Sequence, residues 1–490
     1  MPTRQETRAT RPDVTIADDE IIEHVDPGDR YRATLLAVVM LAVTAFGSLM
    51  TIVTVALGTI ADDLETSRAT LTWVITGLML AMAVMTPLGG KLGDIHGHRK
   101  VFLIGLFAGV LATLASGLAW NAGSLIVFRV AFGMCGAMVI PNAQALMMHA
   151  YGPRRRATAM GWFQFAMTGA PTIGIVLGGP LIDLLGWRAL FLIFAAVNGL
   201  ALVTAALVLE ASPVRKVVAI DYNGAAALAL AVLGALLAIT RFTGQLRDGV
   251  DTAAIFDPLG WLLIVLAVAA TVGFIRVERS APAPMIRLDY FGRRHFTLPM
   301  VSSALMQFAY MGGFVVTPAL LEKRYGWTVG GIALLMAPRP GAFSASAVFG
   351  GYLPQRIGQR LPIVFGSLFM VASMAAFTAA APLTDGVGIG LIVLGLVLTG
   401  IAAGISQPSI SAMVVDAVDE ADMGIANGMS QQVMFIGIVA GIQTMNVLVG
   451  DDGSSSRFVI TYLLGLAVAV AGLLASIAIP RAAARTTVAA

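Results

Sequence analysis

Long apolar stretches separated by short polar segments make up most of the chain. Thirteen stretches of 18 to 30 residues carry at most one Asp, Glu, Lys or Arg each: 33–57, 69–90, 101–120, 122–149, 157–182, 189–209, 222–240, 258–275, 295–321, 361–384, 386–415, 423–450 and 458–480. A fourteenth, 329–350, holds Arg339 between two prolines. Because crossing a bilayer takes about 20 mostly apolar residues, the pattern predicts fourteen membrane spans.

These spans are expected to be α-helices, because lipid offers no partner for an unpaired backbone group. The runs are also too long and continuous for the strands of a membrane barrel. Of 490 residues, 58% are hydrophobic and 12% charged, against about 25% charged in soluble domains. The chain therefore reads as an all-α polytopic membrane protein, and the net charge of +3 is too small to indicate a nucleic-acid partner.

The basic residues predict the orientation. With the polar segment 1–32 inside the cell, 22 Lys and Arg fall in cytoplasmic segments and 7 in outer loops. Basic residues favour the cytoplasmic side of a membrane. We therefore expect a multi-pass protein of the cell (plasma or inner) membrane, with cytoplasmic tails at 1–32 and 481–490.

An internal repeat predicts the domain organisation. At an offset of 261 residues the matches are Gly89/Gly350, Gly90/Gly351, Leu92/Leu353, Gly97/Gly358 and Arg99/Arg360. At an offset of 267 they are Gly133/Gly400, Pro141/Pro408, Ala159/Ala426, Gly161/Gly428, Gln164/Gln431 and Gly174/Gly441. The repeat predicts two six-helix halves, 33–209 and 295–480, joined by a two-helix insertion with its linkers at 210–294. Transporters are often built from such repeats.

Four motifs, in order along the chain, carry a resemblance to a known family. They are Thr51–Ile60, Gly90–Lys100 (GKLGDIHGHRK), Phe128-Arg129 with Gly133 and Gly136, and Gly174–Gly179 followed by Gly186-Trp187-Arg188. With the 6+2+6 layout, the chain resembles the major facilitator superfamily, in particular its fourteen-helix branch of drug:proton antiporters. The resemblance implies a major-facilitator fold and export of small molecules.

Within the Gly90–Lys100 motif, Gly90, Asp94, Gly97 and Arg99 are candidates for a conformational latch. We use this term for a contact that closes one side of a transporter in one state and breaks in the other. Asp94 could accept hydrogen bonds from a helix N-terminus or an arginine. The family usually has a basic residue where this chain has Ile95, so its charge network is missing or rebuilt with His98 and Arg99. The alternative is a basic loop that only sets topology.

Two arginines and two glutamines are candidates for the substrate path. A buried cation in a span is costly unless it faces water or a partner, which makes Arg129 and Arg339 candidate cavity residues. A structural bridge to backbone carbonyls is the alternative for both. Gln164 and Gln431 are chosen because the repeat pairs them.

In the fifth predicted span, Gly174, Gly178 and Gly179 match the family's antiporter motif and permit close helix packing. The family has proline after the first glycine, where this chain has Ile175.

Drug exporters of this branch carry an aspartate in helix 1, just before the position of Thr51, where this chain has Ser48, Leu49 and Met50. A buried carboxylate with a raised pKa is the usual proton carrier, so this protein must use another group or none. His149 and Asp416 are related by the repeat, and histidine titrates near neutral pH. They are a candidate proton-sensitive gate, and the alternative is two interfacial residues in contact with water.

The sequence favours a secondary transporter that exports an amphipathic small molecule by alternating access, with proton coupling implied by the resemblance. The alternatives are a lipid or anionic-amphiphile transporter and, least favoured, a transport-dead scaffold or receptor. No GxxxxGK[ST] loop is present, which disfavours ATP as a partner. With no metal motif and one cysteine, Cys135, we expect no enzyme activity, no cofactor and no disulfide. The expected partners are the bilayer, the substrate and protons, and the expected state is a monomer.

Overall fold

The computed structural model describes residues 28–66, 68–210, 222–247, 257–280, 288–327, 329–449 and 454–480. Within these ranges all regular structure is helical. The elements are α1 (Gly28–Asp63), α2 (Arg68–His96), α3 (His98–Gly117), α4 (Ala122–Val208), α5 (Tyr222–Arg247), α6 (Pro258–Ser280), η2 (Leu288–Gly292), α7 (Arg294–Tyr325), α8 (Val329–Met336), α9 (Pro338–Tyr352), α10 (Pro354–Ile357), α11 (Arg360–Ala380), α12 (Gly386–Asp416), η3 (Glu420–Asp422), α13 (Met423–Val449) and α14 (Ser455–Ile477).

The long element α4 consists of three helical segments. Asn121 begins it with a capping box, in which its side chain accepts from the Ser124 backbone N–H at 2.7 Å. The helix then breaks at Gly152 (φ 64°, ψ 172°) and at Gly186 (φ 78°, ψ 159°). Residues with a side chain rarely adopt these angles, so the two glycines allow the chain to reverse between segments.

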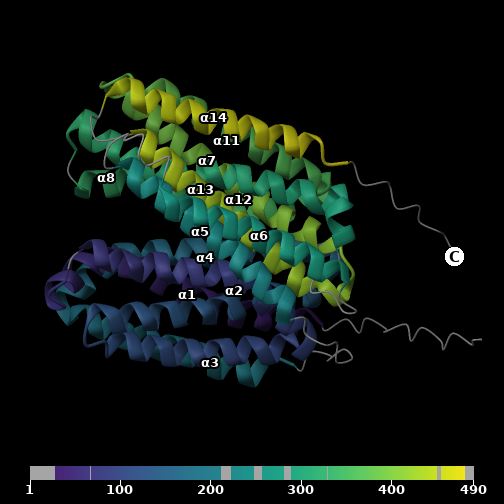
Figure 1. Cartoon of the computed structure of the whole chain (residues 1–490). Helices are drawn as coiled ribbons and strands as arrows, with labels where there is room; N and C mark the ends of the chain where they lie inside the picture. The colour runs from purple at the N-terminus through teal and green to yellow at the C-terminus, as the bar shows by residue number, and fades with distance from the viewer. Residues whose placement is uncertain are drawn as a thin grey trace, which may run out of the picture.

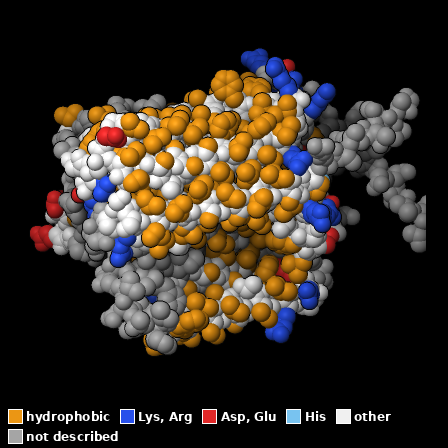
Figure 2. Space-filling model, turned by 90° about the horizontal axis from the view of Figure 1, so that it is seen from above, with side chains coloured by type: hydrophobic (Ala, Val, Ile, Leu, Met, Phe, Trp, Pro, Cys, Tyr) orange, Lys and Arg blue, Asp and Glu red, His pale blue; other side chains and the backbone are white. Residues whose placement is uncertain are grey.

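In the described part of the chain, 11 segments are long and apolar enough to cross a membrane. One of them, Ala122–Gly169, has 48 residues and would be about 72 Å long as a straight helix, but it contains the break at Gly152. The helices α5, α8 and α9 are not among the 11 segments, so the fourteen-span arrangement stays a prediction. Figure 2 shows apolar side chains over the middle of one face and charged side chains towards its two ends.

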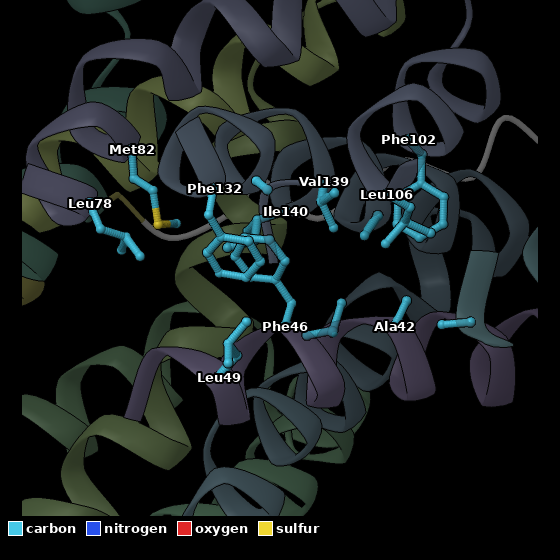
Figure 3. Close-up of a cluster of buried hydrophobic side chains, with 14 of the residues drawn as sticks. Ala42, Phe46, Leu49, Leu78, Met82, Phe102, Leu106, Phe132, Val139 and Ile140 are labelled. Atoms are coloured by element: carbon cyan, nitrogen blue, oxygen red, sulfur yellow. The ribbon is translucent and has the colours of Figure 1, made fainter. Parts of the chain in front are cut away.

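The helices form two bundles (Figure 1). The first bundle, α1–α4, surrounds a core in which the Phe46 and Phe132 rings stack with centroids 4.1 Å apart (Figure 3). The second bundle consists of α7–α9 and α11–α14, and its core includes the stacked pair Phe377 and Tyr462. A third cluster joins α5 and α6 to α2, α7 and α13.

Both described ends of the chain lie at one end of the bundles, which we call the terminal end. There Arg32, near the start of α1, donates to the carbonyl of Ala150 at 2.9 Å. Arg360 donates to the carbonyl of Ile477, at the end of α14, at 2.6 Å. At the opposite end, Arg188 pairs with Asp63 and stacks 4.3 Å from the Trp187 ring.

The break at Gly152 gives a first prediction. An added Cβ would meet nothing within 4 Å, so Gly152→Ala isolates the strain of a positive φ. We expect it to lower the free energy of unfolding by about 1–3 kcal/mol, measured as a lower melting temperature in detergent. The matched control is Gly199→Ala, in a helical part of α4 where a Cβ is equally unobstructed. It should leave stability unchanged or raise it by up to about 1 kcal/mol. Equal effects of the two substitutions would contradict the role of Gly152.

Candidate functional site

At the terminal end, the side chain of Asp94 on α2 caps the N-terminus of α13. Its Oδ1 accepts from the backbone N–H of Gly424 at 2.8 Å, and its Oδ2 accepts from that of Ile425 at 2.9 Å. The Asp94 side chain is only 3% exposed. The first N–H groups of a helix have no partner inside the helix, and the helix dipole favours a negative charge there. The carboxylate therefore binds the first bundle to the second.

Glycine makes this approach possible. A Cβ on Gly90 would overlap the carbonyl of Gly424, and a Cβ on Gly424 would overlap the carbonyl of Gly90. The two backbones are thus in direct contact. Any larger residue at either position would force α2 and α13 apart.

Asp422, just before α13, extends the contact in two directions. Its carboxylate lies 3.7 Å from Lys91 Nζ on α2. It also accepts a 2.8 Å hydrogen bond from the hydroxyl of Tyr290 in η2. Burial and this carboxylate raise the pKa of Tyr290, so the hydroxyl stays protonated and remains a donor.

The other two residues of the motif lie in and after the turn between α2 and α3. Gly97 has a φ of 91°, in the region that favours glycine. Arg99 donates to the carbonyl of Ala206 at 2.8 Å. Arg99 therefore ties the start of α3 to the end of α4 within the first bundle.

The second copy of the repeat makes a corresponding contact. Gly351 packs against the backbone of Ala157 and Gly161 on α4. Thr158 donates from Oγ1 to the carbonyl of Gly351 at 3.0 Å and accepts from Gln355 Nε2 at 2.7 Å. This second contact, between α9–α10 and α4, also joins the two bundles.

The repeat relates the two contacts residue by residue. Asp94 and Gln355 lie 261 positions apart, and Ala157 and Gly424 lie 267 apart, the same offsets as in the sequence matches. Gln355 and Thr158 belong to none of the four sequence motifs. The signal was available, because Gln355 occupies the position of Asp94 in the second copy.

Asp416, one member of the candidate gate, also bridges the bundles. Its carboxylate pairs with Arg156 on α4 and accepts from Gln359 Nε2 at 2.8 Å. The ring of His149, the other member, has its centroid 5.5 Å from that of His98. A gate formed by His149 and Asp416 stays a prediction.

Arg129 is buried in the first bundle, at 1% exposure. Its Nη2 lies 3.5 Å from the carbonyl of Leu49 on α1, and its guanidinium carbon lies 5.1 Å from the Phe132 centroid. Its Nε and Nη1 have no hydrogen-bond partner among the described residues. The cation is thus next to the segment of helix 1 in which an aspartate is usual and absent here.

Arg339 is 4% exposed and lies among aromatic rings of the second bundle. Its guanidinium carbon lies 3.6 Å from the Tyr310 centroid and 4.0 Å from that of Phe314. Its Nη2 donates to the carbonyl of Tyr310 at 3.2 Å, and its Nε has no hydrogen-bond partner in the part of the chain that the structure describes. Aromatic faces stabilise a desolvated cation by about 2 kcal/mol.

For the remaining candidate residues, the structure describes fewer contacts. Gln164 on α4 and Gln431 on α13 are half-buried. Gly174, Gly178 and Gly179 continue the helix of α4, and their packing lies outside what the structure describes.

Several known proteins are similar to this chain in sequence or in fold. The profile of the Major Facilitator Superfamily matches residues 37–442. The tetracenomycin C resistance and export protein of Streptomyces glaucescens is 30% identical over 424 residues, which are 85% of this chain and 76% of that protein. The multidrug transporter protein MdtP of Bacillus subtilis (strain 168) is 26% identical over 423 residues, 86% of this chain and 76% of the relative.

Among solved structures, the crystal structure of the human organic anion transporter MFSD10 (TETRAN) superposes with a TM-score of 0.64. The superposition covers 92% of this chain and 99% of that one, at 16% sequence identity, and it supports the fold alone. The chain is therefore a multi-pass membrane protein that belongs to the Major Facilitator Superfamily, with relatives consistent with the drug:proton antiporter branch.

Proposed function

We propose that the protein is a secondary transporter that exports an amphipathic small molecule by alternating access. In this proposal fourteen spans form two six-helix halves, 33–209 and 295–480, and the insertion 210–294 contributes two further helices. One relative named as a resistance and export protein and another named as a multidrug transporter support efflux. The presence of two bundles, connected by Asp94 and Thr158, supports this proposed division.

The Asp94 contact with α13 carries the proposal. It joins the bundles through a buried carboxylate, two backbone N–H groups and two facing glycines, and every one of these interactions is lost if α2 and α13 separate. Hydrogen bonds to charged groups contribute about 1.5–3 kcal/mol each. That is enough to favour one state and small enough to break during a transport cycle. We call this contact the Asp94 latch.

We further propose that the terminal end faces the cytoplasm, as the distribution of Lys and Arg predicts. The Asp94 latch, and the related contact of Thr158 with Gly351, would then close the cytoplasmic side. Opening them would expose the substrate path to the cell interior, with Arg129, Arg339, Gln164 and Gln431 as its proposed lining. Gly174, Gly178 and Gly179 would allow the fifth span to slide against its neighbours.

Proton coupling is part of the proposal, although helix 1 lacks its usual acid. The backbone carbonyl of Leu49, rather than a carboxylate, lies next to Arg129. The proton site must therefore be elsewhere, and a gate of His149 and Asp416 is one candidate.

A second candidate function is transport of a lipid or an anionic amphiphile. The observation that favours it is the charge of Arg129 and Arg339, both buried, neither of which forms an ion pair with a carboxylate among the described residues. Such cations suit a negatively charged head group. A transport-dead scaffold is the least favoured, because the chain keeps the latch glycines and the two buried arginines.

Transport itself is the first test. Proteoliposomes containing the protein should move a lipophilic fluorescent cation faster when a pH gradient is imposed than when an ionophore collapses it. Protein-free liposomes are the control. No movement of the cation in either condition would contradict cation efflux and leave the anionic alternative to the third test.

The second test concerns the Asp94 latch. Asp94→Asn keeps the shape of the side chain but removes its charge and turns one acceptor into a donor facing an N–H group. We expect the closed state to lose about 1.5–3 kcal/mol, a ten- to hundredfold change in its population ratio, and transport to fall by a similar factor. Asp62→Asn, an exposed acid of α1, is the matched control. A wild-type rate for Asp94→Asn would rule out the latch.

The third test separates the two functions. If the substrate is anionic, Arg339→Gln and Arg129→Gln should each slow transport of an anionic fluorescent amphiphile about tenfold or more. Arg294→Gln, an exposed arginine at the start of α7, should have no effect. Unchanged transport of the anion by both buried-site variants would exclude a head-group role for these arginines.

A further inference from the structure

His98, the first residue of α3, lies directly behind the Asp94 latch. Its Nε2 is 3.5 Å from Asp94 Oδ1, and its Nδ1 is 2.8 Å from Asn142 Oδ1 on α4. The side chains of His98 and Asp94 are 8% and 3% exposed. A titratable ring is thus buried against the carboxylate that holds the bundles together.

The hydrogen bonds of Asn142 determine which nitrogen of His98 carries its proton. Asn142 Nδ2 donates to the carbonyls of Gly89 at 2.8 Å and Met138 at 2.7 Å. This fixes the amide orientation, so Oδ1, which can only accept, faces His98. The Nδ1 of His98 must therefore be the donor, and in the neutral ring Nε2 carries a lone pair.

That lone pair faces a carboxylate oxygen. Two acceptors opposite each other repel, and a single proton between them would convert the repulsion into a charge-assisted hydrogen bond. We propose that His98 and Asp94 together form a proton-binding site that makes the Asp94 latch sensitive to pH at the terminal end. Its physiological meaning rests on the proposed transport function, which places that end in the cytoplasm.

A hydronium ion at the terminal end supplies the proton: one of its O–H bonds breaks and leaves water, and the proton binds between Nε2 of His98 and Oδ1 of Asp94. The pair shares one proton, and the two residues titrate as a unit.

The charged and polar groups around the pair come from each neighbouring element. On α2, Lys91 lies near Asp422 at 3.7 Å. On α4, the His149 ring lies 5.5 Å from the ring of His98. On α13, the N–H groups of Gly424 and Ile425 hold the carboxylate in place.

The direction of the effect follows from the two states. In the closed state the unprotonated pair is buried and the repulsion cannot be screened. Once α13 moves away, water reaches both groups and the repulsion weakens. The proton therefore binds more tightly to the closed state, and by linkage a lower pH favours closure. A difference of one pKa unit between the closed and the open state changes the ratio of closed to open protein by up to about tenfold.

The test measures the conformation directly, without substrate or transport. In a Cys135→Ser background, spin labels at Lys100→Cys and Arg356→Cys, both exposed at the terminal end on different bundles, report their separation. For protein in lipid nanodiscs, we expect the closed population to rise about threefold or more between about pH 8 and pH 6. His98→Gln should abolish this dependence, and His98→Arg, a permanent cation, should remain closed at both values.

Two further histidines serve as comparisons. His96→Gln is the matched control, because His96 is exposed two positions away and bonds the carbonyl of Leu92 at 3.3 Å. It should keep the full pH response. If His98→Gln keeps the response and His149→Gln removes it, the proton site is at His149 and the proposal is wrong. A wild-type protein that opens at low pH would equally overturn it, since protonation would then weaken the Asp94 contact.

A failure of transport that leaves this pH response intact would refute the proposed function and not the proton site. Active transport with no pH response of the distance between the labels would refute the proton site and not the proposed function.

Discussion

The arrangement of the two bundles depends on one electrostatic requirement: the first N–H groups of α13 need an acceptor. Asp94 supplies it from a different bundle. Within one bundle such a cap would only stabilise a helix. Placed across the boundary, the same two hydrogen bonds determine where α2 and α13 lie relative to one another. The positions of Lys91, Asp422 and Tyr290 follow from that placement.

The second contact uses different chemistry at an equivalent place. Gln355 and Thr158 replace the carboxylate and the backbone N–H groups with an amide and a hydroxyl. A neutral pair gains less from a helix dipole than a carboxylate does, and it does not titrate. The two halves of the terminal end are therefore similar in geometry and different in charge. Of these two contacts, the one in which a carboxylate lies against a histidine ring, Asp94 with His98, is the one that we propose responds to a proton.

Much of the fold was predictable from sequence, because span length and the repeat depend on local hydropathy and spacing. The expectation that Asp94 would accept from a helix N-terminus agrees with its contact with α13. The sequence could not identify which helix, since Asp94 and Gly424 are 330 positions apart. It also grouped Arg99 with Asp94, whereas the structure shows Arg99 donating to Ala206. His98, the first residue of α3, is directed at Asp94 because Gly97 reverses the chain between α2 and α3.

The direct contact of Gly90 with Gly424 has a consequence for kinetics. Most helix interfaces interlock side chains, so separating them requires many rotamers to change together. At the point where Gly90 meets Gly424, no side chains interlock, so that part of the interface can separate without a change of rotamer. There the polar bonds around the glycines are the interactions that must break when the two helices separate. In the proposed transport cycle, such a contact would stabilise the closed state without adding interlocked side chains to the barrier for opening.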